Sequence, residues 1–583
     1  MKDMLWDVWT RDKRGFLTIL FLNIAVSLTG GISIVMLVPM LGLLDISDGA
    51  ASALTLFTAP LADIPYGGQV AIMIGGYFLL IVLKALMNRA LSIRENRFLE
   101  DYAYHLRKRL YDTVSGAQWE ALAASRQADT INLFTTQCSQ VSYGAAEIIH
   151  LITAVVSAAV SLCIALWLSV PVTVFVIVCG GISALMFRKL LKSSQTYGDE
   201  MIRINRSMYQ ELFHQLRSIK EVRTYGVQKE HAALFEQVSS SFRDAKLKYV
   251  RLRAFPSMLY SIAAAGVIGV FFLVCVLFFE MDTARLMVLV YVFMRLWPVF
   301  TGLIGRVNSI LTTVPAFRKL SEAFTTLHAE AAADTADEPL PFERDITFRD
   351  VSFAYRGATE NVLRGVSFTL KKGTVTALVG RSGAGKTTIA DLLLGLLTPT
   401  EGEICIDGRA LTPENLPAWR HSLGYIPQDP LILNASVREN LQRFHPHATE
   451  ADMVDALKRA QAWPVIEGLP EGLDTLLGDE GVRLSGGERQ RIVLARVLMG
   501  NPRLIVMDEA TSAMDYESET AVRRAIADLD KQITILIIAH RLATVRTAQY
   551  ALVLEGGQIT EQGELATLLA TNDGYLNKLL TVE

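Results

Sequence analysis

The chain has 583 residues, of which 51% are hydrophobic and 20% are charged, and its formal net charge is −3. This length predicts several domains, and the composition is too apolar for a wholly soluble chain and too charged for one confined to a membrane. The near-neutral charge excludes the strong basic excess expected of a nucleic-acid-binding protein, so nucleic acid is not an expected partner.

Six apolar runs precede residue 310, and each is long enough to cross a membrane, which takes about 20 residues of helix. Only a short turn at Ser169 and Val170 separates the third run from the fourth, which predicts a helical hairpin. The six predicted spans are Phe16–Leu44, Val70–Leu91, Ile148–Leu168, Pro171–Leu190, Phe255–Phe279 and Leu286–Leu303.

Positive charge is concentrated on one side of these spans. The segments after the first, third and fifth spans contain a single basic residue, Arg285. The segments after the second and fourth spans are rich in Lys and Arg, and include Arg107–Arg109 and Lys192. Because positive loops stay cytoplasmic, we expect a multi-pass protein of the cell (inner) membrane with both termini in the cytoplasm.

Two cations inside the apolar runs stand out. Arg295 lies near the middle of the sixth predicted span, and Lys84 lies in the inner half of the second. A charge near the bilayer centre is costly unless it faces protein or water. One interpretation is a cationic cavity that receives an anionic or amphipathic substrate. The alternative is that Lys84 extends to the inner surface and Arg295 pairs with a carbonyl or carboxylate.

Two polar segments continue the spans on the cytoplasmic side. Glu95–Ser115 and Met201–Lys248 contain no proline and almost no glycine, which predicts helices that extend beyond the bilayer. Each segment must turn back toward the membrane, and the expected turning points are near Trp119–Arg126 and Leu216–Tyr225.

The composition changes between Leu327 and Arg344, which form an acidic, alanine-rich stretch with two prolines. Beyond it, short apolar strands alternate with helical stretches, a pattern typical of a parallel α/β sheet. We therefore predict a transmembrane domain at 1–326, a linker at 327–344 and an α/β domain at 345–583. The fold class is an all-α six-helix transmembrane domain followed by this α/β domain.

A glycine-rich loop follows the apolar strand Thr374–Val379 and opens a helix. In this context it is the pattern of a P-loop, whose backbone N–H groups and helix N-terminus bind phosphates. Lys386 can reach the β- and γ-phosphates, and the Thr387 hydroxyl can bind Mg²⁺. The loop predicts ATP and Mg²⁺ as cofactors through Gly380, Arg381, Ser382, Gly383, Ala384, Gly385, Lys386, Thr387 and Thr388.

Two carboxylates end the apolar run Leu504–Met507. Asp508 suits a place among the Mg²⁺ ligands, and Glu509 suits a general base that polarises the attacking water. The pair is informative because it follows a P-loop in the same predicted domain. Together they predict that 345–583 is an α/β P-loop, nucleotide-binding domain.

The segment Leu484-Ser-Gly-Gly-Glu-Arg-Gln490 resembles the signature sequence of ABC transporters. Ser485, Gly486 and Gly487 form a second expected anion-binding turn. Since the P-loop already supplies one phosphate cradle, the second turn makes sense if it closes over nucleotide held by another copy of the protein.

Further positions resemble this family one by one. Tyr355 is similar to the aromatic residue that stacks on adenine, and Gln428 to the loop glutamine that contacts Mg²⁺ and senses the membrane domain. His540 is similar to the switch histidine that contacts the γ-phosphate. Ser512–Asp515 resembles the loop that communicates between two ATP sites. Thr475–Gly481 resembles the cross-talk segment of exporters, with Asp479 where Glu is more usual.

The resemblance implies an ABC half-transporter, and the two turning points resemble the coupling helices of such exporters. The expected activity is ATP-driven export, or flipping, of an amphipathic substrate such as a lipid, peptide or drug, by alternating access in a homodimer or heterodimer. One alternative is import of a siderophore-like compound on the same scaffold. Another is a non-transporting ABC ATPase switch. The sequence leaves the substrate, the direction and the partner open.

Overall fold

The computed structural model of the chain divides into two compact units. The first contains Met1–Ser115 and Ser125–Ala329, and the second contains Gly116–Ala124 and Glu330–Glu583. The described residues are 2–35, 65–124, 127–168, 188–278, 283–328, 340–508, 516–528, 533–539 and 542–570, with a few isolated positions beside these ranges.

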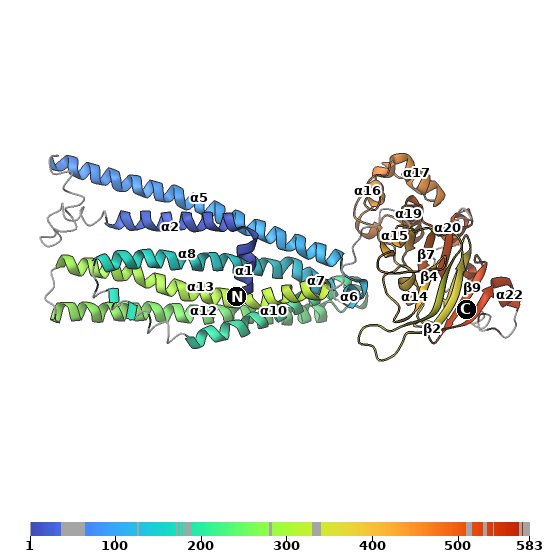
Figure 1. Cartoon of the computed structure of the whole chain (residues 1–583), viewed down its shortest axis with the longest axis horizontal. Coiled ribbons are helices and arrows are strands. Elements are labelled where there is room, and N and C mark those ends of the chain that lie inside the picture. The colour runs from blue at the N-terminus through green and yellow to red at the C-terminus, as the bar shows by residue number, and fades with distance from the viewer. Residues whose placement is uncertain are drawn as a thin grey trace. The chain divides into compact units, whose positions relative to one another are not determined.

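In its described residues the first unit is helical, and most of its helices are long (Figure 1). Five of the six predicted spans lie wholly or largely in helices, whereas the fourth, Pro171–Leu190, lies mainly outside the described residues. The elements are α1 (Lys2–Arg11), α2 (Lys13–Val35), α5 (Tyr66–Ser115), α7 (Gln127–Asn132), the π-helix η2 (Leu133–Gln137), α8 (Cys138–Leu168), α10 (Arg188–Arg217), α11 (Ile219–Tyr225), α12 (Gln228–Phe278) and α13 (Thr283–His328).

The helix α5 runs from apolar into polar sequence without a break, and α12 runs from polar into apolar sequence. α5 has 50 residues, which corresponds to roughly 75 Å at the rise of an α-helix, against a hydrocarbon layer of about 30 Å. Gly67–Ser115 and Asp129–Val160 are the two described stretches that meet a length-and-hydropathy criterion for crossing a membrane. The long helices therefore agree with the predicted extensions beyond the bilayer.

Close packing of α8 against α13 is a main feature of this unit. Glu147 on α8 forms an ion pair of 3.5 Å with Arg306 on α13, and Ile310 is fully buried in the shared core. Gly144 permits this approach, because a Cβ at this position would lie 2.3 Å from the Thr313 hydroxyl oxygen and 2.5 Å from the Met4 methyl carbon.

We expect Gly144→Val to lower the melting temperature of the protein in detergent. The added side chain forces α8, α13 and Met4 apart, and such overpacking costs about 1–3 kcal/mol. Gly75→Val is the matched control, since nothing lies within 4 Å of a Cβ there. Equal melting temperatures for the two variants would show that the α8–α13 contact tolerates the extra volume.

The second unit contains two sheets. The four-stranded sheet has the order β2-β1-β4-β5, and the six-stranded sheet has the order β10-β9-β3-β8-β7-β6. Neighbours in the larger sheet are parallel except for the β10–β9 pair. The strands are β1 (Asp345–Phe353), β2 (Leu363–Lys371), β3 (Val375–Gly380), β4 (Glu401–Ile406), β5 (Arg409–Ala410), β6 (Leu423–Ile426), β7 (Leu504–Asp508), β8 (Thr534–Ile538), β9 (Tyr550–Glu555) and β10 (Gln558–Glu564).

All helices of this unit except α6 come after β3 in the chain. Their buried apolar faces form two clusters with the sheets, and Trp419 is fully buried in one of them. The helices are α6 (Trp119–Ala124), α14 (Lys386–Leu393), α15 (Leu416–Arg420), α16 (Val437–Gln442), α17 (Glu450–Arg459), α18 (Trp463–Glu467), α19 (Gly486–Met499), α20 (Tyr516–Asp528), α21 (Leu542–Val545) and α22 (Leu565–Ala570), with short 3₁₀ turns η3 (Gly472–Asp474) and η4 (Asp479–Gly481).

The α/β fold with a parallel sheet is confirmed. The separate antiparallel sheet was not predicted: the strand expected at Ile346–Phe353 forms as β1, but it pairs antiparallel with β2 and β4. Its residues alternate in burial only at the start, and Val351–Phe353 are buried in succession, as in a parallel strand, so the pattern alone did not decide its sheet.

Candidate ATP-binding site

The predicted P-loop connects the end of β3 to the start of α14. Gly383 and Gly385 have φ angles of +80° and +107°, in the region that favours glycine. At Gly385 a Cβ would also lie 2.8 Å from the Leu363 side chain. The glycines therefore allow the sharp turn that directs backbone N–H groups into the loop, at the N-terminus of α14.

Lys386 is the first residue of α14, and its side chain is 6% exposed. Its ammonium donates hydrogen bonds to the carbonyl oxygens of Gly380 at 2.7 Å and Arg381 at 3.1 Å. These bonds place the charge against the loop predicted to cradle phosphates. Thr387, the next residue, is exposed, so its hydroxyl is accessible for a metal ligand.

Tyr355 lies beside the same helix although it is 33 residues away in sequence from Thr388. Its hydroxyl oxygen is 3.1 Å from the Thr388 hydroxyl oxygen, and its ring packs edge-on against Phe353 with centroids 5.0 Å apart. The ring is 39% exposed, which leaves surface available for an adenine base.

We expect Tyr355→Ala to weaken ATP binding about fivefold, the equivalent of about 1 kcal/mol for a lost aromatic stack. Tyr355→Phe keeps the ring and loses only the contact with Thr388, so its ATP affinity should stay close to wild type. Equilibrium binding of a fluorescent ATP analogue measures both. An equal loss in the two variants would assign the effect to the hydroxyl instead of the ring.

The predicted Mg²⁺ ligands come from neighbouring strands. Asp508 is the last residue of β7 and is 9% exposed. Gln428 follows β6, which pairs in parallel with β7. The carboxyl ends of parallel strands meet at one edge of a sheet, so the order of the strands places both residues at the edge where the P-loop leaves β3.

The donor set suits Mg²⁺. A Thr hydroxyl, an Asp carboxylate and a Gln amide oxygen are hard oxygen ligands, and Mg²⁺ in nucleotide sites takes only one or two protein carboxylates beside phosphates and water. In the described part of the chain, no group of three or more His, Cys, Asp or Glu residues could hold a metal ion by itself.

Asp391 is a residue of this site that the sequence did not single out. Burial, followed by the negative charge of Asp508, raises the pKa of Asp391 to about 6, and a hydrogen bond from Trp119 partly opposes the shift. Asp391 lies four residues after Thr387 and so lies on the same face of α14. From this spacing, the sequence could have predicted that Asp391 belongs to the site. The two carboxylates give this edge a negative potential that suits a cation.

The α6 helix, which belongs to the second unit, contacts two other parts of that unit. The Glu120 carboxylate accepts a hydrogen bond of 2.6 Å from the backbone N–H of Arg356, and Trp119 donates its hydrogen bond to Asp391. These contacts place the first predicted turning point of the cytoplasmic helices beside the residue after Tyr355 and beside α14.

The signature turn begins α19. Ser485 is the N-cap residue, with φ −65° and ψ 161°; its hydroxyl accepts from the Glu488 N–H at 3.3 Å, and the Glu488 carboxylate accepts from the Ser485 N–H at 2.7 Å. This capping box fixes the first turn of a 14-residue helix. Ser485 is exposed, so the positive end of the helix is open to an anion from outside this domain.

Several predicted residues cannot be placed. Glu509, His540 and Ser512–Asp515 lie outside the described residues. Arg295 lies within α13, but its side chain is outside what the structure describes, and Lys84 lies on α5 with a partly exposed side chain.

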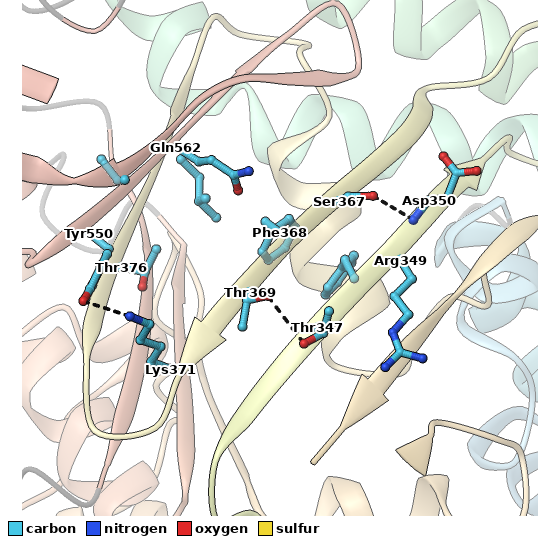
Figure 2. A pocket seen from close by; sticks show the side chains of 14 residues that line it. Thr347, Arg349, Asp350, Ser367, Phe368, Thr369, Lys371, Thr376, Tyr550 and Gln562 are labelled. Atoms are coloured by element: carbon cyan, nitrogen blue, oxygen red, sulfur yellow. Dashed lines mark hydrogen bonds between the residues drawn. The ribbon is translucent and has the colours of Figure 1, made fainter. Parts of the chain in front are cut away.

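A separate hollow of about 630 Å³ lies on another face of the ATPase unit (Figure 2). Polar side chains of β1 and β2 line it together with residues of β9 and β10, and the Lys371 ammonium donates to the Tyr550 hydroxyl at 3.4 Å. None of the predicted ATP-binding residues lines it.

Together, a helical unit and a P-loop unit with a signature turn define an ABC-type transporter. The family model described as ABC transporter transmembrane region matches residues 16–299, and the one described as ABC transporter matches residues 363–512. The chain belongs to the ABC transporter family. It is a membrane protein whose ATPase domain binds ATP and couples its hydrolysis to transport.

Known relatives support this placement. A heterocyst differentiation ATP-binding protein of Nostoc sp. is 29% identical over 80% of this chain and 77% of the relative. An ATP-dependent lipid A-core flippase of Vibrio parahaemolyticus is 32% identical over 68% of this chain and 67% of the relative. An exotoxin translocation ATP-binding protein of Pasteurella aerogenes is 42% identical, over 41% of this chain and about a third (34%) of the relative.

A solved structure of a bacterial Atm1-family ABC exporter with ATP bound has the same fold. It superimposes with a TM-score of 0.79 over 98% of this chain and 99% of the other, at 24% sequence identity.

Proposed function

We propose that this chain is one half of a dimeric exporter, which uses ATP to export or flip an amphipathic substrate by alternating access. The observation that carries the proposal is the presence, in one chain, of one membrane domain, one P-loop and one exposed signature turn. A nucleotide bound by the P-loop of one chain would be closed over by Ser485–Gly487 of a second chain, so two chains complete two sites.

In this proposal the ATP site works through positioned charges. Lys386 and the loop amides would bind the phosphates, and Thr387, Gln428 and Asp508 would bind Mg²⁺, which neutralises phosphate charge. Glu509 would polarise the attacking water, and His540 would contact the γ-phosphate.

The helices α6 and α11 would transmit closure of the ATPase domains to the membrane domain. The contact of Glu120 with Arg356, next to Tyr355, supports this role for α6. The ATPase domain and both termini would lie in the cytoplasm, beneath the inner membrane of a bacterial cell. Arg295 and Lys84 would line a cavity that attracts the anionic part of the substrate.

The relatives named as a lipid A-core flippase and as toxin translocation proteins favour export of a lipid or a peptide over import. The partner would be a second copy of this chain or a related half-transporter, and the composition supports no role for nucleic acid.

Proteoliposomes with the ATPase domain facing outward test direction and oligomeric state together. The mass of the purified protein should be twice 64.3 kDa, and external ATP should drive a fluorescent phospholipid into the lumen or the inner leaflet. Movement of a substrate out of the lumen would support the importer. ATP hydrolysis without movement of lipid, peptide or siderophore in either direction would support a non-transporting switch.

A further inference from the structure

Arg496 is a buried cation in the last turn of α19, the helix that begins at the signature turn. Its exposed fraction is 7%, and no carboxylate in the described residues forms an ion pair with it. Burial lowers the pKa of Arg496 to about 10, which is still far above neutral, so the guanidinium is charged. A buried charge without a carboxylate is costly and needs a role beyond packing.

The contacts of Arg496 lead to the segment that follows Gln428. One terminal nitrogen (Nη1) donates to the Leu431 carbonyl oxygen at 3.1 Å, and the other (Nη2) to the Asn440 side-chain oxygen at 3.4 Å. The guanidinium also lies 4.4 Å from the centre of the Phe444 ring. Leu431 is three residues from Gln428, so this side chain connects the signature helix to the Gln428 loop.

The segment that Arg496 contacts is held rigidly. Asn440 is fully buried; its side-chain oxygen accepts from the Leu433 N–H at 2.8 Å, and its amide nitrogen donates to the carbonyl oxygens of Leu433 at 3.1 Å and Ser436 at 3.0 Å. The Ser436–Glu439 capping box then starts α16.

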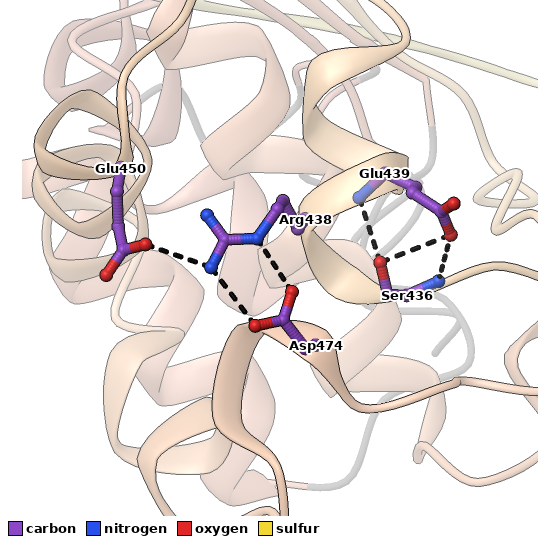
Figure 3. Close-up of polar contacts among 5 residues, drawn as sticks. All are labelled: Ser436, Arg438, Glu439, Glu450 and Asp474. Atoms are coloured by element: carbon purple, nitrogen blue, oxygen red, sulfur yellow. Dashed lines mark hydrogen bonds and ion pairs between the residues drawn. The ribbon is translucent and has the colours of Figure 1, made fainter.

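The same segment is fixed on its other side (Figure 3). The Arg438 guanidinium bonds the Asp474 carboxylate at 2.7 Å and pairs with Glu450 at 2.9 Å, and the Val437 N–H donates to the Thr475 carbonyl oxygen at 3.3 Å. These contacts attach the segment to α17 and to the start of the predicted cross-talk segment. A displacement of α19 would therefore move the segment after Gln428 as one body.

We propose that Arg496 is a positioning residue for ATP hydrolysis, because it fixes the spacing between the signature turn at Ser485–Gly487 and the loop that carries Gln428. The inference rests on the proposed roles of these two elements. Its consequence is that Gln428 reaches its place near Mg²⁺ only when α19 is correctly oriented.

The test is a double-mutant cycle of Arg496→Met and Gln428→Ala in the full-length protein. Arg496→Met keeps an unbranched, flexible side chain and removes the guanidinium with its charge and donors. We expect kcat to fall about tenfold and half-saturating Mg²⁺ to rise, with ATP affinity unchanged, as when a residue that positions a metal ligand is lost. In the Gln428→Ala background, Arg496→Met should lower kcat by less than about a further twofold, because both changes remove the same interaction.

Two further variants separate positioning from folding. Arg496→Lys keeps the charge and should recover part of the lost activity. Ile404→Ala, in the antiparallel sheet, should lower the melting temperature without changing half-saturating Mg²⁺, because Ile404 is buried in a different apolar cluster from Ile432 and Val437 of this segment.

An equal loss of kcat in both backgrounds would overturn the inference, as would a change in melting temperature alone. If Gln428→Ala alone kept the wild-type Mg²⁺ dependence, Gln428 would not be a Mg²⁺ ligand, and the inference would fail. That last result would leave the proposed dimeric transport cycle standing, because the cycle depends on the P-loop and the signature turn.

Discussion

Glu509→Gln is expected to lower steady-state ATP hydrolysis by about two to four orders of magnitude, the contribution of a positioned general base. The amide keeps the size of the side chain but cannot accept the proton of the attacking water. ATP binding should persist, because the P-loop and Tyr355 are unchanged. Phosphate release in nanodiscs measures the loss, and equilibrium nucleotide binding shows what remains.

Glu564→Gln is the matched control, because Glu564 is an exposed carboxylate on β10. This variant should hydrolyse ATP at the wild-type rate. Residual activity above about a tenth of wild type in Glu509→Gln would mean that another group takes the proton. A variant that also fails to bind ATP would point to a folding defect and not to a lost base.

Mixed dimers of two inactive chains should regain hydrolysis. Lys386→Met removes the cation proposed to contact the phosphates, and Ser485→Arg places a bulky side chain at the signature turn. Each variant alone should lose at least about a hundredfold of activity, as when a preorganised transition-state donor is removed. In a mixed dimer, one site combines both defects, while the other has an intact P-loop from one chain and an intact signature turn from its partner.

Co-expression with two different affinity tags isolates the mixed dimers for the same phosphate-release assay. Recovery of a substantial part of wild-type activity would show that each site is built from two chains. Activity as low as in the single variants would contradict the composite site and favour a site within one chain. A dimer that carries both changes on one chain, paired with a wild-type chain, serves as the control, because neither of its sites is intact.

Much of the organisation could be predicted because its signals are local. A membrane span is about 20 consecutive apolar residues, and a P-loop is built from contiguous backbone amides between a strand and a helix. The runs that became α2, α5, α8, α12 and α13, and the loop from Gly380 to Thr388, are each complete in one stretch of sequence. The polar, proline-free second half of α5 likewise predicted that this helix extends beyond the bilayer.

The separate antiparallel sheet could not be predicted, because the apolar pattern of β1 does not reveal which strands are its neighbours. The same limit applies to Asp391. Its position on α14 is local, but its raised pKa depends on burial and on Asp508, which lies at the end of a strand more than a hundred residues later.

The sequence by itself determined the family and the α/β and helical classes, and it predicted the ATP-binding groups, because all of these depend on residue type and short-range spacing. Only the tertiary structure decided which distant groups meet. The strand order places β7 beside β6 and thus Asp508 near Gln428, Tyr355 reaches Thr388, and Arg496 reaches Leu431 and Asn440 across 65 and 56 residues. Such contacts arise from long-range packing, for which no local pattern in the chain is a sufficient signal.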